Sequence, residues 1–162
     1  MVSNNNGYFH GKKRQKMIKL KIIWKKVLVL AIGGGVAFWV ANFAISRTPI
    51  AAEYRAALSI SYLPMLLESL LGGLIIGFCV SYCMLRFFDR IPTRNPLLKS
   101  LILSSIALVL VTVLVEAPSS FLTPATDVLR YFIIGAIFNL LRIFALGIVI
   151  GYLFHRLNGG VR

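Results

Sequence analysis

The stretch LLESLLGGLIIGF, residues 66–78, decides the fold class, because it is apolar except for a single carboxylate, Glu68. Residues 140–152 read LLRIFALGIVIGY, nearly the same pattern, with Arg142 at the position that corresponds to Glu68. Both stretches lie within apolar runs long enough to cross the hydrocarbon core of a bilayer, which takes about 20 helical residues. The sequence therefore predicts transmembrane helices, two of which carry opposite charges at matching points.

The composition is also typical of a membrane protein. Of the 162 residues, 58% are hydrophobic and 14% are charged, and the mean hydropathy is +0.82. A soluble domain of this length needs more polar surface to cover its core. The net charge of +13 comes from lysines and arginines at the ends of apolar runs rather than along an amphipathic face, which argues against nucleic acid as a partner.

Four apolar runs are continuous, which indicates helices rather than barrel strands, in which hydrophobicity would alternate. They cover approximately residues 27–45, 62–85, 97–115 and 131–154. We expect an all-α polytopic membrane protein with a four-helix transmembrane domain over residues 27–158, after a basic, partly disordered segment over residues 1–26. A cleaved signal peptide is the alternative for the first run, which is long for such a peptide and contains Trp39 and Asn42.

The basic residues predict the orientation in the membrane. With a cytoplasmic N-terminus, 14 of the 18 lysines and arginines lie on the cytoplasmic side, and only Arg47, Arg55 and Arg130 lie outside. Such a bias predicts that both termini are cytoplasmic, in a protein integral to the cell membrane. The N-terminal lysines alternate with apolar residues, so this segment either contacts anionic lipids of the inner leaflet or continues directly into the first helix.

The sequence predicts a tandem repeat of a two-helix hairpin, over about residues 27–90 and 97–158. A shift of 74 residues aligns the second span with the fourth, at the identical pairs Leu66/Leu140, Leu67/Leu141, Gly73/Gly147, Ile76/Ile150 and Gly77/Gly151. A shift of 75 aligns TPIAAEYR, residues 48–55, with TPATDVLR, residues 123–130. Because a two-span unit repeats its own orientation, a pseudo-two-fold axis along the membrane normal would relate the two hairpins.

Small residues at four-residue spacing form stripes on three of the expected helices. They are Gly33, Ala37 and Ala41 in the first span, Ser69, Gly73, Gly77 and Ser81 in the second, and Gly147 and Gly151 in the fourth. Small residues let helix backbones approach closely, and this packing replaces the hydrophobic driving force that is missing in lipid. We expect the second span to pack against the fourth through these stripes; homodimerisation through one of them is the alternative.

The charges inside the spans predict an intramembrane polar cluster of Glu68, Asn139, Arg142 and Asn42. A charge near the bilayer centre costs at least about 2.5–3.5 kcal/mol, so it normally faces protein or water and has a partner. The helical rise places Arg142 and Glu68 about 21 and 27 Å above the cytoplasmic boundary, so an ion pair can join them. The pair either clamps the hairpins together or belongs to a polar cavity for an ion or small solute. In a third interpretation, each charge reaches the interface separately.

Neither a metal site nor a cofactor site is expected. Cys79 and Cys83 stand four residues apart, but no acid or histidine is near them in the sequence, so we interpret them as packing residues. His10 and His155 lack the partners of a hydrolase, and the glycines at 33–35 belong to a span rather than to a phosphate loop.

Two functions are consistent with these observations, and neither is enzymatic. The first is a packing, assembly or regulatory component of a larger membrane complex or homo-oligomer, which the small-residue stripes and short loops favour. The second is a small oligomeric transporter or channel with a polar site at Glu68, Asn139 and Arg142, which the repeat and the buried charges favour.

Overall fold

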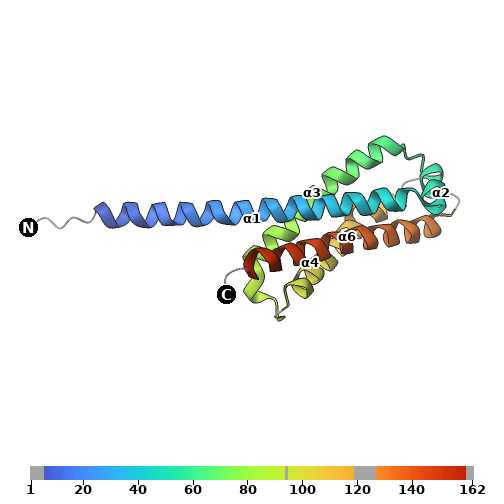
Figure 1. The fold of residues 1–162 in the computed structure, drawn as a ribbon. Coiled ribbons are helices and arrows are strands. Elements are labelled where there is room, and N and C mark those ends of the chain that lie inside the picture. The colour runs from blue at the N-terminus through green and yellow to red at the C-terminus, as the bar shows by residue number, and fades with distance from the viewer. Residues whose placement is uncertain (1–5, 94, 119–126, 160–162) are drawn as a thin grey trace, which may run out of the picture.

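The computed structural model describes residues 6–93, 95–118 and 127–159, with helices as the regular secondary structure of these residues. The elements are α1 (Asn6–Ser46), α2 (Pro49–Ala57), α3 (Tyr62–Phe87), η1 (Phe88–Arg90), α4 (Pro96–Val111), η2 (Thr112–Glu116) and α6 (Val128–Gly159). Figure 1 shows α1, α3, α4 and α6 in one bundle, with the start of α1 and the end of α6 at the same end. We call this end the terminal end and the opposite one the α2 end.

Four helical stretches are long and apolar enough to cross a membrane, which confirms the all-α class and the four expected spans. They are Leu20–Ser46, Tyr62–Phe87, Pro96–Val115 and Val128–Asn158. Large apolar side chains point outward along them, and Leu63 is 71% exposed and Leu114 69% exposed. An apolar surface of this extent is unfavourable in water and suits a lipid environment.

Helix α1 is 41 residues long and has no break between the basic segment and the first span. At 1.5 Å per residue it is about 62 Å long, so it extends beyond the other helices at the terminal end (Figure 1). Of the segment expected to be basic and partly disordered, residues 6–26 are helical, and residues 1–5 lie outside the described residues. The basic segment therefore continues the first span as one helix.

Local signals explain where the shorter helices begin and end. Thr48 caps α2, because its Oγ1 accepts a hydrogen bond from the Ala51 amide at 3.3 Å, and a proline follows it at the first helical position. Asn95 caps α4 in the same way through the Leu97 amide at 3.0 Å. The connection from α2 to α3 turns at Ser59, which has a positive φ of 54°.

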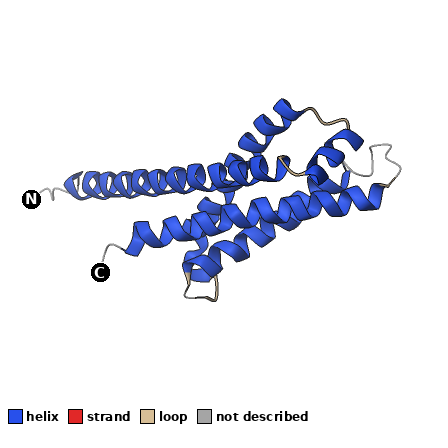
Figure 2. Cartoon of the chain, turned by 45° about the vertical axis from the view of Figure 1, so that its right-hand side comes forward, coloured by secondary structure: helices blue, strands red, loops and turns tan. Residues whose placement is uncertain are grey.

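The packing corrects the expected contact between the second and fourth spans. Helix α1 packs against both α3 and α6, and α4 packs against α6, whereas α3 meets α4 and α6 at few positions. Figure 2 shows the same bundle from another side, with α6 and α4 side by side below the long α1. Each hairpin therefore holds its two helices together, and α1 joins the two hairpins by packing on α6.

The small-residue stripe of α3 faces α1. A Cβ added at Gly77 would lie 2.8 Å from the carbonyl oxygen of Ala31, and one added at Gly73 would lie 2.9 Å from the ring of Phe38. Both glycines are buried, as are Ser69 and Ser81 of the same stripe. The stripe was expected to face the fourth span, but it lets the α3 backbone lie directly on α1.

The stripe of α6 faces α4 in the same manner. A Cβ at Gly151 would lie 2.9 Å from the Leu97 Cα, and one at Gly147 would meet the Ser104 hydroxyl. The hydroxyl of Ser100 donates a hydrogen bond to the Gly147 carbonyl at 2.7 Å. In both hairpins, the second helix thus lies against the first through its own small residues.

The three consecutive glycines of α1 allow it to contact two helices at once. A Cβ added at Gly33 or Gly34 would meet side chains of α6, and the one at Gly34 would lie 2.7 Å from the side chain of Ile150. A Cβ added at Gly35 would instead meet Leu74 of α3. Gly33 therefore contacts α6, and Ala37, one turn further along α1, is half-buried.

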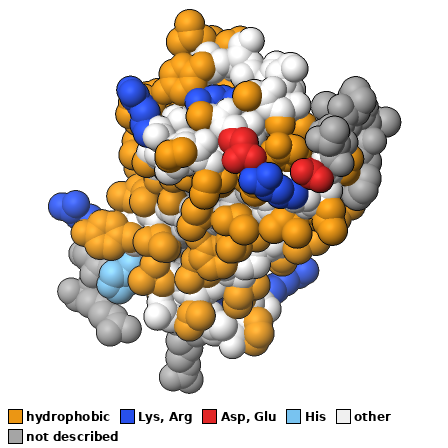
Figure 3. All heavy atoms as spheres, turned by 90° about the vertical axis from the view of Figure 1, so that its right-hand side faces the viewer, with side chains coloured by type: hydrophobic (Ala, Val, Ile, Leu, Met, Phe, Trp, Pro, Cys, Tyr) orange, Lys and Arg blue, Asp and Glu red, His pale blue; other side chains and the backbone are white. Residues whose placement is uncertain are grey.

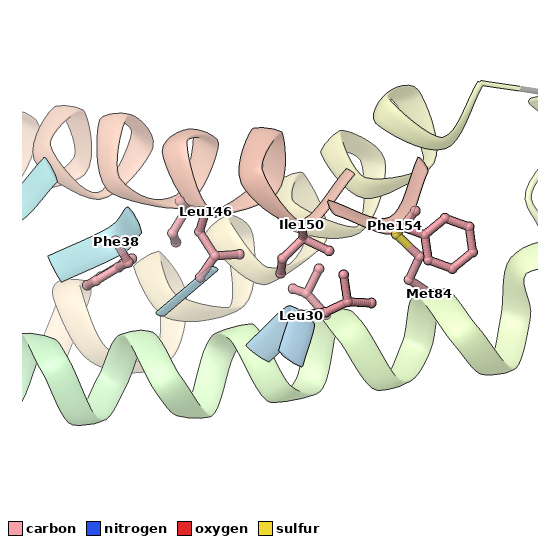
Figure 4. Packing of buried hydrophobic residues seen from close by; sticks show 8 residues of the cluster. Leu30, Phe38, Met84, Leu146, Ile150 and Phe154 are labelled. Carbon is pink, nitrogen blue, oxygen red and sulfur yellow. The ribbon is translucent and has the colours of Figure 1, made fainter. Parts of the chain in front are cut away.

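An apolar core fills the terminal half of the bundle. Its buried members come from α1, α3 and α6, as Figure 4 shows, and they are Leu30, Phe38, Val80, Met84, Ile143, Leu146, Ile150 and Phe154. At the terminal end, Lys26 Nζ donates to Asn158 Oδ1 at 2.6 Å. The buried Lys99 donates to the Phe88 carbonyl, and the Phe88 ring stacks on Phe154 at 4.8 Å. These contacts join the helices of the terminal half.

Candidate functional site

A cavity of about 280 Å³ lies at the α2 end, between α1, α2, α3, η2 and α6. The polar residues on its walls are Asn42, Ser46, Tyr54, Arg55, Glu68, Asn139 and Arg142. The structure brings the four residues of the predicted polar cluster, Asn42, Glu68, Asn139 and Arg142, to this one cavity. Figure 3, which faces the α2 end, shows acidic and basic side chains gathered among hydrophobic ones.

Asn42 is the most deeply buried polar residue of the cavity wall. It is 1% exposed, and neither its amide oxygen nor its amide nitrogen has a hydrogen-bond partner among the described residues. An amide buried without partners costs about 1–3 kcal/mol, and such groups in native proteins usually meet water, an ion or a ligand. The Asn42 amide therefore offers one donor group and one acceptor to whatever occupies the cavity.

Asn139 and Arg142 lie one turn apart on α6, so both face the cavity. Nη1 of Arg142 donates to Oδ1 of Asn139 at 3.5 Å, and the guanidinium lies 5.8 Å from the centre of the Phe138 ring. Asn139 is buried and Arg142 is half-buried. The wall formed by α6 thus presents a fixed positive charge beside an amide.

The predicted ion pair between Glu68 and Arg142 does not form among the described residues. Both side chains line the cavity, but Glu68 is exposed at its edge. The reason is that α3 packs on α1 and meets α6 at few positions, so the cavity separates the acid from the base. The opposite charges at matching points of the two spans therefore share a cavity without clamping the hairpins together.

Helix α2 forms the roof of the cavity, a role that the sequence analysis did not assign to this segment. Nη1 of Arg55 donates to the Ser46 carbonyl at 3.0 Å, and its guanidinium lies 5.2 Å from the Tyr62 ring centre. The Tyr54 ring packs edge-on against Phe138 at 5.7 Å. The Thr-Pro pair at residues 48–49 is the signal that could have revealed this helix, since it is a helix start.

An ion pair joins the roof to the other hairpin. Nη2 of Arg130, at the start of α6, lies 2.8 Å from Oε1 of Glu53 on α2. Both side chains are about half exposed, so the pair contributes little stability. It links α2 to the start of α6.

A second, mainly apolar groove of about 340 Å³ adjoins the cavity between α3 and the α4–η2 wall. Glu68, Arg142, Met65, Val111 and Val115 line both spaces. The wall segment η2 is a π-helix, a departure from α-helical geometry that is frequent at functional sites.

The described residues contain no group of three or more His, Cys, Asp and Glu side chains close enough to hold a metal ion. Cys79 and Cys83 are free thiols on α3. Comparisons with protein-family models, with curated proteins and with solved structures found no significant match. The chemistry of the cavity is therefore the basis for a functional proposal.

Proposed function

We propose that this chain is a small membrane transporter that binds its substrate in the polar cavity at the α2 end. The observation that supports this proposal is the buried Asn42 amide on the wall of a space of about 280 Å³. Polar and charged groups at membrane depth are costly, and they mark substrate or ion pathways. If Asn42 served packing alone, its amide would be expected to have a hydrogen-bond partner or to be replaced by an apolar side chain.

The two halves of the bundle suggest which state of a transporter this is. The cavity lies at the α2 end, and the apolar core closes the terminal half. With both termini in the cytoplasm, as the distribution of basic residues favours, the cavity lies toward the outside of the cell membrane, beneath the α2 roof. The arrangement is that of a state in which α2 covers a binding site at the outer end.

We also propose that the two hairpins are a tandem repeat related by a pseudo-two-fold axis along the membrane normal. The support is that each hairpin uses the same positions for the same contact. Gly73 and Gly77 pack on α1, and Gly147 and Gly151 pack on α4. Repeats of this kind place a binding site at their interface, where the cavity lies.

A cysteine-accessibility experiment tests whether the cavity is wet. In a background with both native cysteines replaced by alanine, Met65→Cys places a thiol on the cavity wall, and Met84→Cys places one in the apolar core of the same helix. In proteoliposomes, an impermeant maleimide should label Met65→Cys on the order of tenfold faster, because only a hydrated thiol ionises readily. Equal labelling of the two variants would contradict the proposal. Flux of ions and small organic solutes through the same proteoliposomes then tests transport itself.

The second candidate function is an assembly or regulatory component, and the long α1 favours it. The basic part of α1 extends beyond the bundle, where anionic lipids or a cytoplasmic partner could contact it (Figure 1). The small-residue stripes support this candidate less than the sequence suggested. The stripes of α3 and α6 pack against the other helix of their own hairpin and so are not free for a partner. Affinity purification from native membranes tests it, and a chain that always purifies alone counts against it.

A further inference from the structure

The cavity does not end at its polar wall, because the apolar groove continues it between α3 and α4. Glu68 and Arg142 stand at the junction of the two spaces, and the groove then runs along Phe38, Ile75 and Ile76. Its walls are almost entirely hydrocarbon. A ligand that fills both spaces therefore has a polar part beside Arg142 and an apolar part along α3.

The groove lies beside an exposed apolar surface. Helices α3 and α4 meet at few positions, and Ile75 of the groove wall is 65% exposed. A molecule already dissolved in the bilayer can enter between the two helices without crossing the roof formed by α2. This route suits a lipid better than a water-soluble solute.

The basic groups on the cavity wall indicate the chemistry of the polar part. Two guanidinium groups, of Arg55 and Arg142, line the cavity together with one carboxylate, of Glu68. Guanidinium groups bind phosphate with paired hydrogen bonds, and basic pockets between transmembrane helices bind lipid head groups. The amide of Asn42 adds a donor and an acceptor within the same cavity.

We infer that the ligand is a membrane phospholipid that enters sideways between α3 and α4. Its phosphate lies at Arg142 and Asn42, and one acyl chain lies along the groove. Glu68, at the junction, accepts a hydrogen bond from a hydroxyl or ammonium group of the head group. This inference rests on the proposed function, since it names the substrate class for the same cavity.

Gly72 provides a way to block the groove without disturbing the fold. It lies on the groove wall, and a Cβ added there meets nothing within 4 Å. Gly72→Leu should therefore fill the path of the acyl chain and leave the polar cavity open. The matched control is Leu71→Phe, which adds bulk at the preceding residue of α3. The Leu71 side chain is 62% exposed and is not on the groove wall. Ile75→Trp is a second blocking variant.

The experiment measures phospholipid that stays bound to the purified full chain, by native mass spectrometry, after incubation with phosphatidylglycerol in mild detergent. Wild type and Leu71→Phe should retain the lipid, and Gly72→Leu and Ile75→Trp should lose it. Arg142→Gln should weaken apparent affinity by roughly 10- to 100-fold, because it removes charge-assisted hydrogen bonds. Labelling of Ile60→Cys, which lines the cavity and is not on the groove wall, should be as fast in the Gly72→Leu background as without it, which would show that the cavity itself is intact.

Two results overturn the inference, and they are distinguishable. If glycerol 3-phosphate binds and phosphatidylglycerol does not, or if Gly72→Leu and Ile75→Trp retain lipid as wild type does, the groove holds no substrate lipid, and the proposed transporter function stands. If neither probe binds and Met65→Cys is as unreactive as Met84→Cys, the cavity is dry, and both proposals fail.

Discussion

The terminal half and the α2 half of this bundle are built from the same long helices, yet they differ in what lies between them. In the terminal half, apolar side chains of α1, α3 and α6 fill the interior, and glycines bring backbones into contact. In the α2 half, the interior is a cavity with charged and amide side chains on its walls. The difference indicates that the terminal half supplies stability, whereas the α2 half gives up stability to keep a polar space.

The largest effect is expected where helix backbones touch in the terminal half. Gly77→Leu should prevent folding or destabilise by about 3 kcal/mol or more, because its Cβ would collide with the Ala31 carbonyl, which cannot move away as a flexible side chain can. The same substitution five residues earlier, Gly72→Leu, is the control and should change little. Thermal melting in detergent measures both. Equal melting temperatures would show that α3 does not lie on α1 at Gly77.

The apolar core gives the next largest effect. Leu146→Ala should cost about 2–5 kcal/mol, because it leaves a cavity among fully buried side chains. Leu141→Ala, on the exposed face of the same helix, should cost about 0.5 kcal/mol or less, because lipid fills the space of the lost methyl groups. Unfolding free energies that do not separate the two variants would contradict the closed core.

In the α2 half, we expect Asn42→Leu to raise the stability of the protein rather than lower it. Asn42→Leu is close in volume and removes an unpartnered buried amide, so it should stabilise by roughly 1 kcal/mol while abolishing ligand binding. Asn139→Leu should instead destabilise, because it removes the acceptor of the Arg142 hydrogen bond. The readouts are melting in detergent and retention of phosphatidylglycerol. A destabilised Asn42→Leu would mean that the amide has a structural partner.

The smallest effect is expected at the roof. The coupling energy of Glu53 and Arg130, from a double-mutant cycle with Glu53→Gln and Arg130→Gln, should be about 0.2–1 kcal/mol, because the pair is about half exposed and salt screens it. The coupling should fall as salt rises. A coupling that is independent of salt would show that the pair is not solvated and that α2 is more tightly closed than the exposure indicates.

The four helical spans and the polar residues near the cavity follow from the order of residues. Each span is an uninterrupted apolar run, and Glu68, Asn139 and Arg142 stand out because charge and amide groups are rare in such runs. The cost of placing a residue in lipid is a property of that residue and its neighbours along the chain, so it can be read without knowing the fold. The same holds for the bias of lysine and arginine toward one side.

The choice of helix neighbours does not follow in this way. Gly73, Gly77, Gly147 and Gly151 show which faces approach a helix, but a small-residue stripe fits any backbone, so it carries no information about its partner. That α3 lies on α1 and α6 on α4, that Glu68 and Arg142 face one cavity without pairing, and that α2 covers it are properties of packing among distant segments. Packing depends on how whole helix faces fit together, and only the folded chain brings those faces into contact.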